Sequence, residues 1–420
     1  MKITLTQFRP NTAEAVWTDC FAQAIAELHK AGGGVLTVPT GEYSTGPIEL
    51  CSNIELHLEP GAVIRFLNDP AAFPLQECQY EGRISHRPKP CLSAFNAENV
   101  ALTGSGVLDG CGAPWWAAQR ARTLANGRPY LLHFENVTHL RVCGVQLRNS
   151  PAWTVHPLNC VDVLIEDVSI CNPYNSPNTD GINPESCRDV RILNCRVDVG
   201  DDCITLKSGT EETPSPVPCE NIVIANCLLV HGHGGIVIGS EMSGGVRNVT
   251  VTNCVFTGTD RGLRVKTRRR RGGCVENLRL SNLVMERVFC PFVFNMYYSC
   301  GTAEKDRWVW EKTPYPVDGG TPAFRNIRIN GVTVVGATAS AGFFYGLAES
   351  PIDGLSLTDC HIEMARGAAP EKPAMMGNLE PMSARGFFLR NAKNVEFHNV
   401  TLKNADGEAY DTDASVDGVF

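Results

Sequence analysis

The residues of this sequence that could do chemistry fall in four short motifs, in order along its middle. They are Asn178-Thr179-Asp180-Gly181, Gly200-Asp201-Asp202, Gly232-His233-Gly234 and Arg264-Val265-Lys266. Hydrolysis of a glycosidic bond needs a proton donor for the leaving oxygen and a carboxylate that activates water or attacks the sugar. Neighbouring carboxylates that cannot all ionise together raise the pKa of one of them, which makes that group a general acid. By themselves, paired aspartates would equally indicate a Ca²⁺ site or a solvated turn.

The cationic residues near these acids favour an anionic substrate. Arg264 and Lys266 lie two places apart, so on a strand both side chains face the same way. Such a pair would bind a substrate that carries a carboxylate on every sugar. The run Arg268–Arg271 would either grip more of that polyanion or form a solvated turn.

Two further motif residues have open interpretations. His233 alone would more often be structural, but between glycines on the carboxylate face it would orient or tune the acid. Asn178 would either bind substrate or form a turn. Trp115 and Trp116 would stack on sugar or serve as buried anchors.

An internal repeat supplies the framework for these motifs. Alternating apolar residues broken by Asn, Asp or Gly begin at His139, Asp162, Asp189, Asn221, Asn248 and Asn277, with weaker copies at Asn53, Asn99, Asn326, Gly354 and Asn394. A lone unit could not bury its inner face, so successive units must stack as coils of an all-β solenoid, a parallel β-helix. Asp201 and His233 both lie twelve places after a repeat start. They should therefore lie one above the other, about 4.8 Å apart.

The repeat also explains many of the 18 cysteines. Cys195, Cys227, Cys254 and Cys360 each lie six places after a repeat start, where small apolar residues would form an internal ladder. The chain has no paired C-x-x-C, so reduced thiols are expected rather than a metal site or a disulfide framework. No metal or other cofactor is expected.

A single catalytic domain over residues 1–420 is predicted, with one helix and four long loops. Residues 18–31 form an amphipathic helix that caps the first coil, with Thr18 as the cap residue and Gly32–Gly34 ending the helix. Departures from the repeat predict loops at 66–91, 110–130, 290–323 and 365–384, and such loops usually build the binding face of a solenoid.

Composition excludes several other classes. A net charge of −8 argues against a general nucleic-acid binder, and no apolar run is long enough to span a bilayer. The N-terminus shows no secretory signal pattern. A cytoplasmic protein is therefore expected. Its expected binding partner, from the cation pair Arg264 and Lys266, is an acidic oligosaccharide; the oligomeric state stays open.

At the four motifs the sequence resembles the polygalacturonases of glycoside hydrolase family 28, whose signature segments are NTDG, GDD, GHG and RxK. The resemblance is strongest from Trp153 to Lys266. It implies a right-handed parallel β-helix and a metal-free, inverting hydrolysis of α-1,4-galacturonosyl linkages. It also implies that Asp201 is the general acid and that Asp180 and Asp202 activate water. His233 would assist the acid, and Arg264 and Lys266 would hold substrate carboxylates.

The resemblance leaves other assignments open. The family has a substrate-contacting tyrosine, for which Tyr298 is the candidate and Tyr297 the alternative. SPNTDGINPESC and the long loops look like bacterial exo-acting members. A rhamnogalacturonan or xylogalacturonan hydrolase of the same family is an alternative. A Ca²⁺-dependent pectate lyase and a β-helix that only binds polysaccharide are more distant ones.

Overall fold

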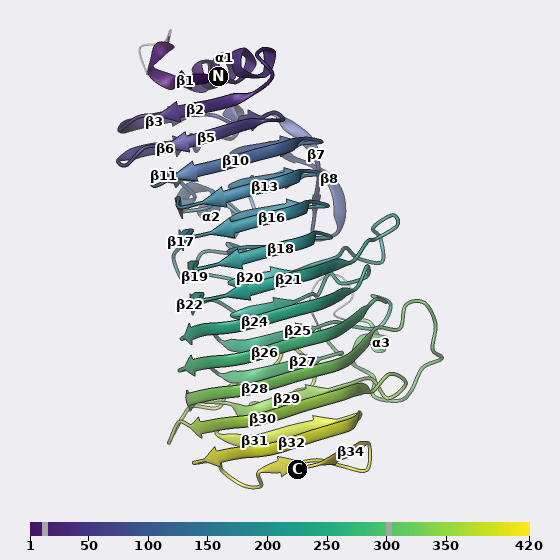
Figure 1. Cartoon of the computed structure of the whole chain (residues 1–420). Coiled ribbons are helices and arrows are strands. Elements are labelled where there is room, and N and C mark those ends of the chain that lie inside the picture. The colour runs from purple at the N-terminus through teal and green to yellow at the C-terminus, as the bar shows by residue number, and fades with distance from the viewer. Residues whose placement is uncertain (11–15, 300–304) are drawn as a thin grey trace. The chain divides into compact units, whose positions relative to one another are not determined.

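The computed structural model describes residues 1–10, 16–299 and 305–420. They form two compact units, Met1–Asp201 and Asp202–Phe420. Within each unit, strands from successive repeats pair in parallel, as the coils of a β-helix must (Figure 1). Many corners between strands are Asn or Asp residues at positive φ, such as Asn248 at 58°. The predicted right-handed parallel β-helix is confirmed, in accord with the handedness of parallel crossover connections.

The first unit contains two parallel sheets and one antiparallel hairpin. The larger sheet consists of β1 (Lys2–Thr4), β2 (Gly34–Val38), β3 (Gly41–Thr45), β5 (Ile54–Leu58), β6 (Ala62–Phe66), β10 (Glu98–Gly104), β11 (Val107–Asp109), β13 (Thr138–Cys143), β14 (Gln146–Arg148), β16 (Val161–Glu166), β17 (Ser169–Cys171), β18 (Arg188–Leu193) and β19 (Arg196–Val199). The second sheet consists of β4 (Ile48–Leu50), β9 (Leu92–Phe95), β12 (Leu132–Glu135) and β15 (Val155–Leu158). The hairpin pairs β7 (Leu75–Tyr80) with β8 (Arg83–Pro88).

The N-terminal helix α1 spans Thr18–Lys30 and buries Phe21, Ala24, Ile25 and Leu28, as its pattern predicts. The predicted cap at Thr18 is wrong, because the helix begins at Thr18 itself. The Thr18 Oγ1 instead accepts a hydrogen bond from the backbone N–H of Gly46 at 2.7 Å. Short 3-10 turns occupy Leu5–Gln7 and Pro70–Ala72. In the described part of the chain, no helix has the length and apolarity to cross a membrane.

Two of the predicted loops in the first unit contain regular structure. The segment 66–91 holds the β7–β8 hairpin, because its residues pair with each other instead of joining a coil. The segment 110–130 contains helix α2 (Ala113–Arg120). Trp115 and Trp116 on α2 are buried, and the Trp116 indole donates to the Ser150 carbonyl at 2.9 Å. These tryptophans are therefore internal anchors and not a sugar-stacking surface.

The second unit also contains two parallel sheets. The first consists of β21 (Cys219–Ala225), β22 (Leu228–His231), β24 (Val246–Thr257), β26 (Cys274–Glu286), β28 (Ala323–Ala337), β30 (Ile352–Met364), β32 (Ala392–Lys403) and β34 (Val416–Val419). The second, with seven strands, consists of β20 (Ile204–Leu206), β23 (Ile236–Ile238), β25 (Arg261–Lys266), β27 (Cys290–Asn295), β29 (Ser340–Tyr345), β31 (Arg385–Arg390) and β33 (Tyr410–Asp411).

The loop predicted at 290–323 is wrong at its start, because Cys290–Asn295 continue the seven-stranded sheet as β27. The buried residues Cys290–Asn295 show no alternation of apolar and polar residues, so their pairing with β25 is what identifies them as a strand. Residues 300–304 of this loop lie outside the described residues. Further along, helix α3 spans Arg307–Trp310. The segment 365–384 is largely irregular, as predicted.

Internal ladders hold the coils of the second unit together. Strand register places Cys254, Leu283, Val332, Cys360 and Val400 at one position of successive coils. Both cysteines of this ladder are buried, and every cysteine of the described residues is a free thiol. The predicted role of these cysteines as compact apolar residues is confirmed.

A second ladder runs along a corner and consists of asparagines at positive φ. The Asn248 amide donates to Asn221 at 3.1 Å, Asn277 to Asn248 at 3.0 Å, and Asn326 to Asn277 at 2.6 Å. Asparagine tolerates the left-handed conformation better than most residues, and its amide can both donate and accept. The repeat therefore fixes the corner through backbone preference and through side-chain hydrogen bonds.

We expect Asn277→Ala to lower the midpoint of thermal unfolding more than Asn277→Gly. Alanine loses both ladder hydrogen bonds and also meets a cost of about 1–2 kcal/mol in the left-handed conformation, which glycine avoids. Asn330→Ala, an exposed strand position, is the control and should change stability by less than about 0.5 kcal/mol. Equal midpoints for the alanine and glycine variants would show that the backbone conformation contributes nothing.

Candidate active site

Asp180 and Asp201 lie together in the first unit. One carboxylate oxygen of each lies within 4.8 Å of the other. Asp180 is buried, and its backbone carbonyl accepts a hydrogen bond from the Thr154 N–H at 2.8 Å, beside β15. Asp201 is half-buried and is the last residue of the unit. The two acids therefore meet the requirement for a pair of neighbouring carboxylates.

Arg128, which no sequence motif marks, holds the segment that leads to Asp180. Its guanidinium is buried and donates to the Asn178 Oδ1 at 2.6 Å and to the Pro177 carbonyl at 2.5 Å. Asn178 itself has a φ of 50°. The side-chain amide oxygen of Asn178 thus already accepts a hydrogen bond from Arg128. The side-chain N–H groups of Asn178 make no hydrogen bond to another described side chain. Burial is the main reason that the pKa of Arg128 is lowered.

Asp202, the next residue along the chain, begins the second unit and forms two buried ion pairs. Its Oδ1 accepts from Arg264 Nη1 at 3.0 Å, and its Oδ2 accepts from Lys266 Nζ at 2.8 Å. All three side chains are buried. Both cations come from β25, two residues apart, so the predicted common face of Arg264 and Lys266 is confirmed.

These partners decide the ionisation of Asp202. Burial raises the pKa of the Asp202 carboxyl. The charges of Lys266 and Arg264, with a smaller contribution from His233, lower this pKa by more than burial raises it. The net result is a pKa well below the ordinary value, so Asp202 is a carboxylate and not a proton donor. Burial and the neighbouring Arg264 lower the pKa of Lys266.

His233 is exposed on a turn between two glycines. A Cβ atom at Gly234 would lie 2.6 Å from Val237 Cγ2 and 3.3 Å from the Arg264 side chain. Glycine at this position therefore lets the turn approach Arg264 closely. The predicted stacking of His233 on Asp201 joins the two units and stays a prediction.

Tyr298, rather than Tyr297, lies beside the cation pair. Its ring centroid is 5.9 Å from Arg264 Cζ and 5.4 Å from Lys266 Nζ. The Tyr297 ring is fully buried and contacts Lys312 Nζ at 3.3 Å from its centroid. Of the two candidate tyrosines, only Tyr298 faces the cations.

The segment Lys372–Met376, which we call the strap, packs on the cations of β25. The carbonyls of Lys372 and Pro373 accept hydrogen bonds from Arg261 at 2.8 and 3.0 Å. The Met375 Sδ lies 3.0 Å from Arg264 Nη2. The sequence predicts only a loop here, because nothing in its irregular composition indicates which coil it covers.

The arginine run after β25 is internal, so its interpretation as a solvated turn is wrong for three of its four residues. Arg268 and Arg271 are buried and pair with Glu211, and Arg269 is buried and pairs with Glu349. Arg270 is exposed and lies over the Trp308 ring. The buried three hold loops together through these ion pairs and are not exposed to a polyanion.

A further buried ion pair lies close to this centre. Lys207 Nζ donates to Glu241 Oε2 at 2.8 Å, and both residues are buried. Burial raises the pKa of Glu241, but Lys207 and then Arg271 lower it to about 2. The charge of Lys207 also contributes to the lowered pKa of Lys266.

Carboxylate oxygens are also the ligands that hard metal cations prefer. Asp202 fits that role poorly. Both of its oxygens already accept hydrogen bonds from Arg264 and Lys266, whose positive charges would repel a second cation.

Comparisons with known proteins agree with this arrangement. A family model described as glycosyl hydrolases family 28 matches residues 36–366. A probable polygalacturonase of Vitis vinifera is 30% identical over 363 residues, which are 84% of this chain and 72% of that protein. An endo-polygalacturonase of Pectobacterium carotovorum subsp. carotovorum is 30% identical over 61% of this chain and 65% of its own.

A solved structure extends the similarity to three dimensions. The crystal structure of a hyperthermoactive exopolygalacturonase from Thermotoga maritima is similar with a TM-score of 0.74 and 30% identity. The matched region covers 96% of this chain and 92% of the other. Relatives with both endo and exo in their names thus occur at similar identity.

We expect Glu241→Gln to destabilise the protein by about 3–5 kcal/mol at neutral pH, because it removes the carboxylate of a buried ion pair. The folded-state pKa of Glu241, about 2, lies below its ordinary value of 4.5. The ion pair therefore stabilises the fold fully above pH 4.5, and this contribution is lost as the pH falls toward 2. Denaturant unfolding at several pH values would show a flatter acid dependence in the variant.

The matched control for this experiment is Glu286→Gln, which removes the exposed pair between Glu286 and Arg287. Its effect should stay below about 1 kcal/mol. A Glu241→Gln protein as stable as the parent at pH 7 would show that Lys207 does not need this ion pair.

Proposed function

Because the chain belongs to glycosyl hydrolase family 28, we propose that it hydrolyses α-1,4-galacturonosyl linkages of pectic oligosaccharides. The observation that carries the proposal is the charge of the buried cluster on β25. Arg264 and Lys266 are two buried cations that Asp202 holds on one face of β25. They would attract a substrate carboxylate in a site where burial strengthens electrostatic interactions.

In the proposed reaction, Asp201 is the general acid. It transfers its proton to the glycosidic oxygen as the bond from that oxygen to the anomeric carbon breaks. A water molecule attacks the anomeric carbon and gives its proton to Asp180 or Asp202. The lowered pKa of Asp202 supports its role as a base, because the group is already ionised. His233 would assist Asp201.

The remaining site residues would bind the substrate. Arg264 and Lys266 would hold a carboxylate next to the bond that is cleaved, and Tyr298 would contact the sugar from beside them. Asn178 would use its N–H groups, since its carbonyl oxygen is bound to Arg128.

We also propose exo action with inversion of configuration. Exo action is supported by similarity to the Thermotoga maritima exopolygalacturonase over most of both chains. Inversion rests on the family pattern alone.

We also propose a cytoplasmic location, which the state of the cysteines supports. The cysteines of the described residues are free thiols, which a reducing compartment maintains. An enzyme there would act on imported oligosaccharides, in keeping with exo action.

We expect Asp201→Asn to lower kcat on trigalacturonate by about 10²–10⁴-fold, because the amide cannot supply the proton. Asp198→Asn is the control, since Asp198 lies three residues earlier and pairs with Arg196 at 3.1 Å. Asp198 is partly buried but is not one of the proposed site residues, so its variant should retain activity within about twofold. Both variants should unfold at the parent's temperature. Full activity in Asp201→Asn would remove the acid assignment.

The products should reveal both the pattern of attack and the stereochemistry. On longer oligogalacturonides we expect the smallest product to accumulate from the first minute, because an exo enzyme removes sugars from one chain end. Proton NMR of fresh product should show the β-anomer, as inversion of an α-linkage requires. A spread of mid-sized products would contradict exo action. An unsaturated product absorbing in the ultraviolet, abolished by chelator, would indicate a lyase instead.

A further inference from the structure

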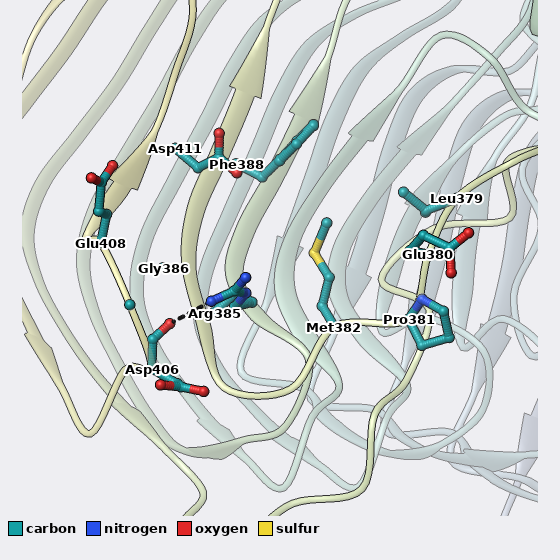
Figure 2. A pocket seen from close by; sticks show the side chains of 11 residues that line it. Leu379, Glu380, Pro381, Met382, Arg385, Gly386, Phe388, Asp406, Glu408 and Asp411 are labelled. Carbon is teal, nitrogen blue, oxygen red and sulfur yellow. Dashed lines mark hydrogen bonds between the residues drawn. The ribbon is translucent and has the colours of Figure 1, made fainter.

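A cavity lies on the same sheet as Arg264 and Lys266. It is a cavity of about 670 Å³ in the second unit, between the irregular segment after the strap, β31 and β33. That volume lies in the range of small-molecule sites. Figure 2 shows Met382 in its middle, Leu379 and Pro381 on one side, and Arg385, Asp406 and Glu408 on the other.

Strand register connects this cavity to the catalytic face. From Arg264 on β25 the paired positions are Val293, Phe343, Phe388 and Asp411, and from Lys266 they are Asn295, Tyr345 and Arg390. Side chains in register on parallel strands point to the same face. Phe388 and Asp411 line the cavity. The cavity therefore opens on the face that carries the cation pair, with β31 three strand spacings, about 14 Å, from β25.

The charges of the cavity differ from those of the cation pair. Its lining includes four carboxylates, Glu380, Asp406, Glu408 and Asp411, but only one cation, Arg385. Arg390 neutralises Asp411 at 2.7 Å. In the described part of the chain no cation lies within ion-pair distance of Asp406 or Glu408. The excess of negative charge would repel a uronate.

The lining instead suits an uncharged sugar. Carboxylates accept hydrogen bonds from hydroxyl groups, and Leu379, Pro381 and Met382 offer an apolar wall to the C–H face of a ring. The Arg385 side chain is steadied by the Asp406 carbonyl at 3.2 Å. Phe388 is fixed by stacking on Phe343, with centroids 5.1 Å apart, and by Arg390 over its ring. Apolar surface with a few oriented polar groups is typical of small-ligand sites.

We propose that this cavity is an accessory site for a neutral sugar residue of the same oligosaccharide that is cleaved at β25. This proposal rests on the proposed function and narrows its substrate to galacturonides that also carry an uncharged sugar, in the chain or as a branch. The strap supports a connection between the two sites. Lys372–Met376 contact Arg261 and Arg264, and Leu379–Met382, which begin three positions after Met376, form one wall of the cavity.

The test is binding of methyl α-L-rhamnopyranoside and methyl β-D-xylopyranoside to the intact protein by ligand-observed NMR and calorimetry. Neither methyl glycoside contains the linkage that is hydrolysed. We expect at least one to bind. Glu408→Gln removes an ionised acceptor and should weaken binding by about fivefold or more, the factor expected for one lost hydrogen bond. Met382→Trp fills the cavity and should weaken binding by at least as much.

Glu396→Gln on β32 is the matched control and should leave binding unchanged, since Glu396 is exposed outside the cavity. All three variants should retain the parent's unfolding temperature and its kcat/KM on trigalacturonate within about twofold, as expected away from the catalytic groups. On galacturonides that carry the bound sugar, only Met382→Trp and Glu408→Gln should raise KM.

Several outcomes would overturn the proposal. They are no binding of either glycoside, equal binding to Met382→Trp, binding of galacturonate as tight as that of the neutral sugars, and a cavity that takes Ca²⁺ in place of sugar. Inactivity on every galacturonide with intact glycoside binding would refute the proposed hydrolysis and leave the sugar site standing. Activity without glycoside binding would do the reverse.

Discussion

The site depends on one buried interaction, the carboxylate of Asp202 held between Arg264 and Lys266. Removing three charges from water is costly, and their mutual attraction offsets that cost only when the geometry is good and the hydrogen bonds are made. Here each carboxylate oxygen has its own cationic donor. The group that could act as a base is thereby kept ionised, and the two cations are kept in place beside it.

The fold supplies that geometry through strand register. Across parallel coils, residues in register have the same orientation. Along one strand, residues two places apart also have the same orientation. Arg264 and Lys266 use this rule on one strand, and Arg264, Phe343 and Phe388 use it across strands. The ladders of Asn221, Asn248 and Asn277 at the corner hold successive coils in that register. A slip of one residue would turn the cations into the apolar interior.

What the sequence predicts well is what repeats. The coil pattern, α1, the cysteine ladder and the shared face of Arg264 and Lys266 all follow from local periodicity. Tyr297 and Tyr298 show the limit. Continued alternation from Asn295, which is in register with Lys266, would have placed Tyr297 on the catalytic face. However, the strand ends at Asn295, whose side chain accepts from the Tyr297 N–H at 2.9 Å. The bend that follows turns Tyr298 toward the cations.

The sequence does not predict the contacts of Arg128, the strap or the buried arginines for a related reason. Their partners lie far away in the sequence and carry no periodic signal.

The distribution of charge along the seven-stranded sheet is a second property that no single motif reveals. β25 carries the buried cations Arg264 and Lys266, whereas three coils further along the cavity lining has more carboxylates than cations. A uniformly anionic ligand would be attracted at the first position and repelled at the second. A ligand with its carboxylate at one end and an uncharged, partly apolar ring at the other would complement both. The strap that contacts Arg264 continues along the chain into the wall of the cavity, so the two positions share one irregular segment.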